Sequence, residues 1–172
     1  MRWRIELGHG EGALLCIFYY LWQMISFHNE DVTFTLKSKA ALKSWIEAIV
    51  KKHKRKAGEI SFVFCSDSFL LNMNQEYLDH DTYTDIITFD YSKGEANAPI
   101  SGEIFISIDR VKENADAFGS STGSGPERFE RELHRVIIHG VLHLLGFGDK
   151  TKKAKEEMRK KEDLCLKALK TK

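Results

Sequence analysis

Residues 136–147 (VIIHGVLHLLGF) place two histidines inside an otherwise apolar run, and this segment constrains the fold more than any other. Its apolar residues have helical spacing, which predicts one long helix over residues 127–145. A helix of this kind buries its apolar face only by packing against other elements of a domain. The chain has 172 residues, of which 42% are hydrophobic, so it can build one compact domain around this helix.

The rest of the chain mixes strand and helix patterns. Alternating or β-rich apolar runs predict four strands, at residues 32–36, 59–65, 85–91 and 103–108. Helical spacing predicts four further helices, at residues 38–56, 68–78, 109–118 and 151–169. Residues 119–126 (GSSTGSGP) are typical of a mobile loop. Together these elements predict an α+β fold, a single domain in which a small mixed β-sheet packs with helices.

The first 23 residues differ from the rest of the chain. Residues 13–22 (ALLCIFYYLW) form a short apolar run, but acidic residues interrupt its start and no small-residue cleavage site follows. Three interpretations are open: a spurious extension upstream of a start at Met24, a real but poorly structured extension, or a cleaved signal peptide. We predict a non-native or disordered extension at residues 1–23 and a single functional domain at residues 24–172.

Charge and cysteine content exclude several classes of protein. Lys and Arg number 26 and Asp and Glu 25, so the formal net charge of +1 excludes a globally basic nucleic-acid binder but allows local basic patches. The three cysteines lie far apart without a C-x-x-C motif, which excludes a disulfide framework and a thiolate zinc site. No apolar run reaches the roughly 18 residues of a membrane span. We therefore expect a protein of the reducing cytoplasm.

The two histidines of the long helix are spaced to hold a metal ion. His139 and His143 lie one turn apart on one face, so both imidazoles can point at the same ion. Gly146 can adopt a positive φ and reverse the chain, which can return the carboxylate of Asp149 to that ion. Two imidazoles and one carboxylate leave a fourth position for water, as in catalytic zinc sites. We predict one Zn²⁺ per chain, held by His139, His143 and Asp149 on the long central helix and the tight glycine turn after it.

A histidine pair at this spacing also arises by chance. The surrounding residues help to decide between a metal site and a chance pair. In an otherwise apolar run, two unpaired imidazoles would cost burial free energy. His134 lies about 140° around the helix from His139 and is interpreted as a surface or structural histidine. Zinc proteases of the H-E-x-x-H type place a general base directly after the first histidine, where this chain has Gly140. We expect Gly140 to leave room for a substrate or a neighbouring backbone close to the metal.

Three motifs are spread over the chain: HGVLHLLGFGD at residues 139–149, NQEYLDHDTYTDIITF at residues 74–89, and SGEI at residues 101–104. In this combination the chain resembles the YbeY family of bacterial endoribonucleases, the rRNA maturation factors. The family patterns are H-G-x-L-H-L-x-G-[YF]-D-H, N-x-x-Y-R-x-x-D-x-P-T-[DN]-V-L-S-F and L-G-[DE]-I. Met158 and Glu162 also fall where the family has a Met and a Glu after the metal motif.

Four departures from the family pattern concern the metal motif and the segment around the family Arg. Asp149 replaces the usual third histidine, but a carboxylate oxygen binds zinc at nearly the same distance as an imidazole nitrogen, so we expect the site to persist. Gly148 replaces an Asp and Tyr83 replaces a Pro. Leu78 replaces an Arg that is thought important for activity in the family. Because an Arg near a phosphodiester stabilises developing negative charge, this change bears on cleavage more than on metal binding.

The resemblance implies a zinc-dependent, single-strand-specific endoribonuclease that acts in rRNA maturation, at the 3′ end of small-subunit rRNA, and in ribosome quality control. It implies RNA and the ribosome or its small subunit as partners, with neither a membrane nor DNA. The attacking group is either water or the 2′-OH of the RNA. Asp85, Glu103 and Glu132 are candidates for a base or for partners of the metal ligands, and none is assigned a catalytic role.

RNA binding requires positive charge near the site despite the neutral total. Two basic clusters are available, at residues 51–56 and at residues 150–155. Both are also compatible with ordinary solvated helix ends. The second cluster directly follows Asp149, which favours a role in binding for that cluster alone.

Two other functions are compatible with the same residues. A metallopeptidase-like hydrolase shares the arrangement of helix, turn and ligand, although Gly140 argues against it. A non-catalytic, zinc-containing ribosome-assembly factor would act by binding alone, and Leu78 in place of the family Arg favours it.

Overall fold

A computed structural model of the chain describes residues 25–78, 81–92, 94, 98–118 and 123–169. The extension predicted at residues 1–23 lies outside the described residues. Within these ranges, no helix combines the length and the apolar character that a membrane crossing requires. Cys65 and Cys165, the two described cysteines, are free and buried.

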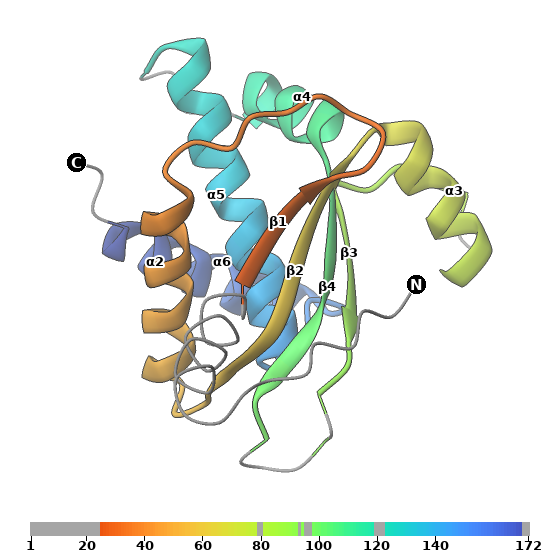
Figure 1. Cartoon of the computed structure of the whole chain (residues 1–172). Helices are drawn as coiled ribbons and strands as arrows, with labels where there is room; N and C mark the ends of the chain where they lie inside the picture. Colours follow the sequence, from red (N-terminus) through yellow and green to blue (C-terminus); the bar gives the residue numbers. More distant parts are fainter. Residues whose placement is uncertain (1–24, 79–80, 93, 95–97, 119–122, 170–172) are drawn as a thin grey trace, which may run out of the picture.

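Four strands form one mixed sheet in the order β1-β2-β4-β3 (Figure 1). Strands β1 (Ile25–Asn29), β2 (Ala57–Cys65) and β4 (Ile100–Ser107) are parallel, and β3 (Ile86–Asp90) pairs antiparallel with β4. Apolar residues alternate along the central strands, so that one face of β2 presents the buried Ile60, Phe62 and Phe64 to the main core.

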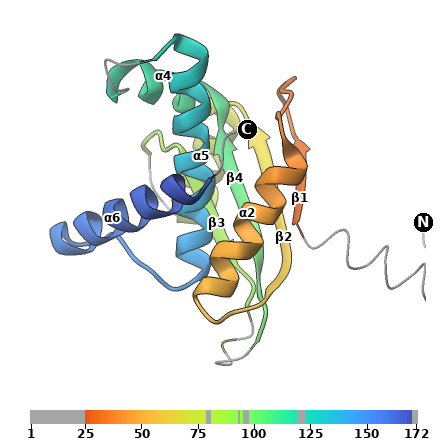
Figure 2. The ribbon, with the colours of Figure 1, turned by 90° about the vertical axis from the view of Figure 1, so that its left-hand side faces the viewer.

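In the part of the chain that the structure describes, five helices pack around this sheet. Figure 2 shows α2 (Lys39–Lys52) and α5 (Gly125–Leu144) on one face, with α6 (Lys152–Ala168) packed on α5 farther from the sheet. Helix α4 (Ile108–Phe118) packs on α5, and α3 (Asp67–Leu78) covers part of the opposite face through a smaller cluster around Leu70. The architecture confirms the predicted α+β class.

Helix α5 lies close against β3 and β4 because Gly140 has no side chain. A Cβ atom at this position would lie 2.8 Å from Cγ2 of Ile104 and 2.9 Å from Cδ1 of Ile86. Gly140 therefore faces the sheet. Of the two uses expected of it, room for a substrate is wrong, whereas a neighbouring element, the sheet, does approach it closely. Its role is the close approach of helix and sheet.

The first strand lies earlier in the chain than predicted. Residues 32–36 are not a strand, and β1 occupies Ile25–Asn29 instead. Phe34 and Leu36 pack against the main core, so alternate residues of an extended segment are buried without strand pairing. Alternation of apolar and polar residues indicates that every second side chain is buried. It does not show whether the segment hydrogen-bonds to the sheet.

Two helix boundaries also differ from the prediction. Helix α5 begins at Gly125 because Ser124 and Glu127 form a capping box, in which the Glu127 carboxylate accepts a hydrogen bond from the Ser124 backbone N–H at 2.7 Å. The predicted loop at residues 119–126 thus ends in the first turn of α5, and its residues 119–122 lie outside the described residues. Helix α2 ends at Lys52, shortly before Lys54 adopts a left-handed φ of 57°.

Candidate metal centre

The last two turns of α5 bring the predicted histidine pair together. The ring centroids of His139 and His143 are 4.5 Å apart, and their Nε2 atoms lie 2.9 Å from each other. Both side chains are partly exposed, although the helix around them is mostly buried. The pair therefore presents two nitrogen atoms to one point that a solute can reach.

The turn after α5 returns Asp149 to this point. Gly146 has a φ of +89°, a conformation that glycine adopts without strain. The Phe147 backbone N–H donates to the Leu142 carbonyl at 3.0 Å, which closes the reversal. An Asp149 carboxylate oxygen lies 3.8 Å from Nε2 of His139, and one ligand atom from each of the three residues lies within 4.8 Å of the others. The spacing that the sequence predicts is present.

The Nδ1 atoms of both histidines lie within hydrogen-bonding distance of acceptor oxygens. Nδ1 of His139 lies 2.6 Å from Oε1 of Glu162, and Nδ1 of His143 lies 2.9 Å from the Phe147 carbonyl oxygen. A carboxylate and a carbonyl accept hydrogen bonds, so each imidazole carries its proton on Nδ1. The two Nε2 lone pairs then face each other, and a metal ion bound by both, or a proton shared between them, removes their repulsion. These residues fit a metal ion.

The electrostatics of His143 favour a metal over a proton in that position. Burial and the neighbouring His139 lower the pKa of His143, against the opposite effect of Asp149. A neutral imidazole is the form that ligates a metal.

Glu162 of α6 is the member of this site that sequence reasoning left without a role. Its side chain is buried, with 3% of its surface exposed. Burial raises the pKa of Glu162, but the hydrogen bond to His139 and the charges of Arg135 and Arg159 lower it more. Glu162 therefore stays a carboxylate and orients the His139 ring. The family resemblance includes a Glu at this position, but no spacing in the sequence predicts that Glu162 lies beside α5.

Comparisons with known proteins show which family this chain belongs to. The sequence pattern of the family described as Endoribonuclease YbeY matches residues 24–170. The chain belongs to the YbeY endoribonuclease family. It is 49% identical over 144 residues to an Endoribonuclease YbeY of Cytophaga hutchinsonii, covering 84% of this chain and 94% of that protein. It is 45% identical to that of Flavobacterium psychrophilum, with 84% and 95% covered.

A solved structure has a fold similar to that of this chain. The solution structure of TM1509 from Thermotoga maritima superposes with a TM-score of 0.54 at 28% sequence identity. The match covers 84% of this chain and 88% of TM1509. The side chain of Leu78, which stands where the YbeY pattern has an Arg, lies outside the described residues.

The three carboxylates considered as candidate bases lie in two different places in this YbeY-family domain. Asp85 and Glu132 both bind Arg135, whose Nη2 lies 3.0 Å from Asp85 and 2.6 Å from Glu132. Glu103 accepts a hydrogen bond from the Tyr91 hydroxyl at 3.1 Å. It alternates with Ile104, which faces α5, so Glu103 lies on the opposite face of the sheet. The structure therefore separates Glu103 from the histidine pair.

A cavity of about 400 Å³ lies beside the histidine pair. His143 and Asp149 form part of its wall, together with Lys150 and Lys161. Nζ of Lys161 lies 4.1 Å from the centroid of the Phe147 ring, a cation–π contact that holds the ammonium near the turn. The cavity thus combines candidate metal ligands with two cations.

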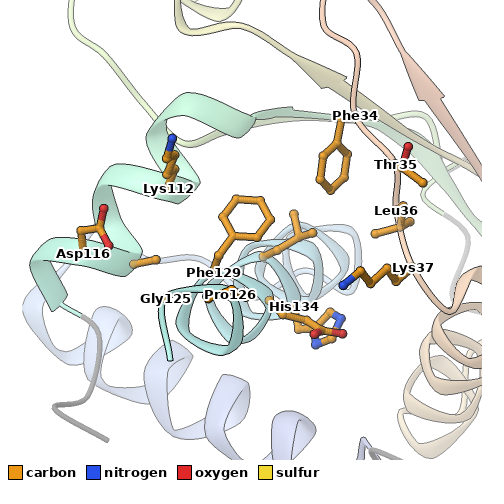
Figure 3. Close-up of a pocket in the computed structure, with 13 residues that line it drawn as sticks. Phe34, Thr35, Leu36, Lys37, Lys112, Asp116, Gly125, Pro126, Phe129 and His134 are labelled. Carbon is orange, nitrogen blue, oxygen red and sulfur yellow. The ribbon is translucent and has the colours of Figure 1, made fainter. Parts of the chain in front are cut away.

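His134 belongs to a different cavity at the other end of α5 (Figure 3). This cavity of about 340 Å³ lies among α4, the first turns of α5 and residues 34–37, with Phe34 and Phe129 in its wall. His134 is buried, its ring packs edge-on against Trp45 at 6.2 Å, and burial lowers its pKa. It is a structural histidine, one of the two roles predicted for it.

Proposed function

We propose that this YbeY-family chain is a zinc-dependent, single-strand-specific endoribonuclease, with His139, His143 and Asp149 as the zinc ligands. We further propose that it acts in the cytoplasm in the maturation of the small-subunit rRNA 3′ end and in ribosome quality control, with residues 24–172 as the catalytic domain. The observation that carries the metal site is the pair of Nε2 lone pairs 2.9 Å apart, with a carboxylate beside them. The family match carries the endoribonuclease activity.

The charges around the site favour a divalent cation. Arg135 and Arg159 are the arginines of this cluster, and its carboxylates belong to Asp85, Glu132, Asp149 and Glu162. The Asp149 carboxylate adds a negative charge directly beside the two facing Nε2 atoms, which favours a bound cation. Tetrahedral coordination by two imidazoles and one carboxylate is a common zinc arrangement with one position left for water or substrate.

Each residue of the site has a role that follows from its contacts. A bound zinc ion supplies Lewis-acid stabilisation of phosphate charge or activation of water. His139 and His143 present their Nε2 atoms to the ion, and Glu162 and the Phe147 carbonyl hold the two Nδ1–H groups in place. Lys150 and Lys161 are positioned in the cavity wall to bind the phosphates of a single-stranded RNA.

Metal content tests the ligand set directly. We expect about one zinc per chain in the wild-type protein, measured by mass spectrometry after purification. Asp149→Ala removes one of three ligands, which costs about 3 kcal/mol, or about 100-fold in zinc affinity. Asp163→Ala is the matched control, because Asp163 is an exposed carboxylate of α6. No zinc in the wild type, and none taken up on addition, would contradict the proposed metal site.

RNA affinity tests the phosphate-binding role of the cavity wall. Lys161→Gln removes one cation, and we expect it to weaken binding of a single-stranded RNA by about 1 kcal/mol, or about fivefold. The slope of log affinity against log salt concentration should fall by about 0.7. Binding is measured by fluorescence anisotropy at several salt concentrations. Lys160→Gln is the control, since Lys160 is an exposed neighbour on α6 outside the cavity wall, and an equal effect of both changes would contradict this role.

One observation favours the non-catalytic ribosome-assembly factor as a second candidate. Leu78 stands where the family has an Arg, and this removes a cation that could stabilise developing charge on a phosphate. The two candidates differ in whether the zinc centre must be intact for rRNA processing.

A further inference from the structure

A partly buried arginine links three parts of the fold beside the candidate metal centre. The Arg135 side chain is 16% exposed and contacts a carboxylate of α5, one just before β3 and one of α6. Its fork lies 2.6–3.0 Å from Glu132 one turn earlier in α5, and its Nη2 lies 3.0 Å from Asp85, which immediately precedes β3. Its Nη1 lies 3.7 Å from Oε2 of Glu162.

We propose that Arg135 is a positioning residue of the metal centre, acting on His139 through Glu162. This inference rests on the proposed function, because it assigns a residue that supports the same zinc ligands. The Glu162 carboxylate turns Oε1 toward His139 and Oε2 toward Arg135. The guanidinium attracts Oε2 as an ion pair, which favours the rotation of the carboxylate in which Oε1 binds the imidazole.

Two other carboxylates, those of Glu132 and Asp85, hold the Arg135 guanidinium in position. Glu132 binds the guanidinium through both carboxylate oxygens, and Asp85 approaches the same Nη2 atom from the sheet. A planar, rigid fork held at two edges cannot rotate without breaking charge-assisted hydrogen bonds. The chain of contacts Asp85–Arg135–Glu162–His139 thus transmits the geometry of the sheet edge to the metal ligand.

Arg159 also approaches Glu162, but the structure assigns it a smaller effect. Its Nη1 donates a hydrogen bond to Oε2 at 3.3 Å, but the Arg159 side chain is 61% exposed. Solvent screens the charge of an exposed arginine, and ordering its long side chain costs conformational entropy. Arg135 lies farther from Oε2, but its side chain is only 16% exposed and is already ordered by two other carboxylates, so its attraction to Glu162 is screened less.

Zinc affinity distinguishes this role from a general contribution to folding. In the full chain, Arg135→Lys keeps the positive charge but loses the planar fork, and we expect zinc affinity, measured by competition with a chelator, to fall about tenfold. The d–d absorption bands of the cobalt-substituted protein should shift, because the His139 ring is no longer held in one orientation. The NMR signal of the His139 Nδ1 proton should weaken in the metal-free protein, a readout independent of bound metal.

A second variant keeps the test decisive if Arg135→Lys does not fold. Asp85→Asn is nearly isosteric and releases the sheet side of the guanidinium, so it should weaken zinc binding in the same direction by about threefold. Arg159→Gln should change zinc affinity by less than about twofold. Folded Arg135→Lys and Asp85→Asn proteins with wild-type zinc affinity would overturn the inference, as would an Arg159→Gln effect as large as that of Arg135→Lys. Failure of the wild type to bind zinc would instead contradict the proposed function.

Discussion

His143→Ala is expected to abolish zinc binding and RNA cleavage together. His143 supplies one of the two facing Nε2 atoms, and the Phe147 carbonyl holds its ring in place through Nδ1. Alanine offers no ligand atom at this position. Metal assistance contributes several kcal/mol to such reactions, and about 4 kcal/mol corresponds to a loss of about 1,000-fold in cleavage rate. The measurement is cleavage of a labelled single-stranded RNA, with zinc content determined on the same samples.

His134→Gln is the matched control for this prediction. His134 lies on the same helix but in the other cavity, against Trp45, so its replacement should leave zinc content and cleavage by the folded protein unchanged. A zinc-free His143→Ala protein that still cleaves RNA would contradict the metal-dependent mechanism. A His143→Ala protein that restores rRNA processing in cells would support the non-catalytic assembly factor instead.

Gly140→Glu is expected to destabilise the domain strongly rather than create a protease. The substitution introduces the H-E-x-x-H spacing of zinc proteases, but position 140 faces Ile86 and Ile104 of the sheet. Overpacking costs about 1–3 kcal/mol, and burying a carboxyl group without a partner costs about 1–3 kcal/mol more. A combined loss of about 4 kcal/mol is a large fraction of the roughly 5–15 kcal/mol that stabilises an ordinary domain. Chemical denaturation followed by circular dichroism measures this loss.

Gly125→Glu is the matched control on the same helix. A Cβ at Gly125 meets no atom within 4 Å, and a carboxylate in the first turn interacts favourably with the helix dipole. We expect its stability to stay within about 0.5 kcal/mol of the wild type. A stable Gly140→Glu protein that cleaves casein would revive the metallopeptidase interpretation.

The candidate metal ligands could be predicted because they are local in sequence. His139 and His143 are separated by one helical turn, and Gly146 and Asp149 follow within one reversal of the chain. Helix geometry and the positive φ of a glycine determine the relative positions of these residues without knowledge of the remaining fold.

The residues that support those ligands could not be placed in the same way. Glu162 lies 23 residues after His139, and Asp85 lies 50 residues before Arg135. Their meeting depends on how α6 and the start of β3 pack around α5, which no spacing encodes. The orientation of Gly140 has the same origin, because helical periodicity describes a face but does not say which neighbour covers it.

The docking of α6 has a consequence for the dynamics of the domain. Helix α6 buries only Met158, Glu162 and Cys165, and its Cys165 carbonyl accepts a hydrogen bond from the Trp45 indole at 2.9 Å. A helix with so few buried residues opens by local unfolding more readily than the sheet does. Because opening would withdraw Glu162 from His139, a bound metal should slow amide hydrogen exchange along α6, including in turns that lie far from the ion.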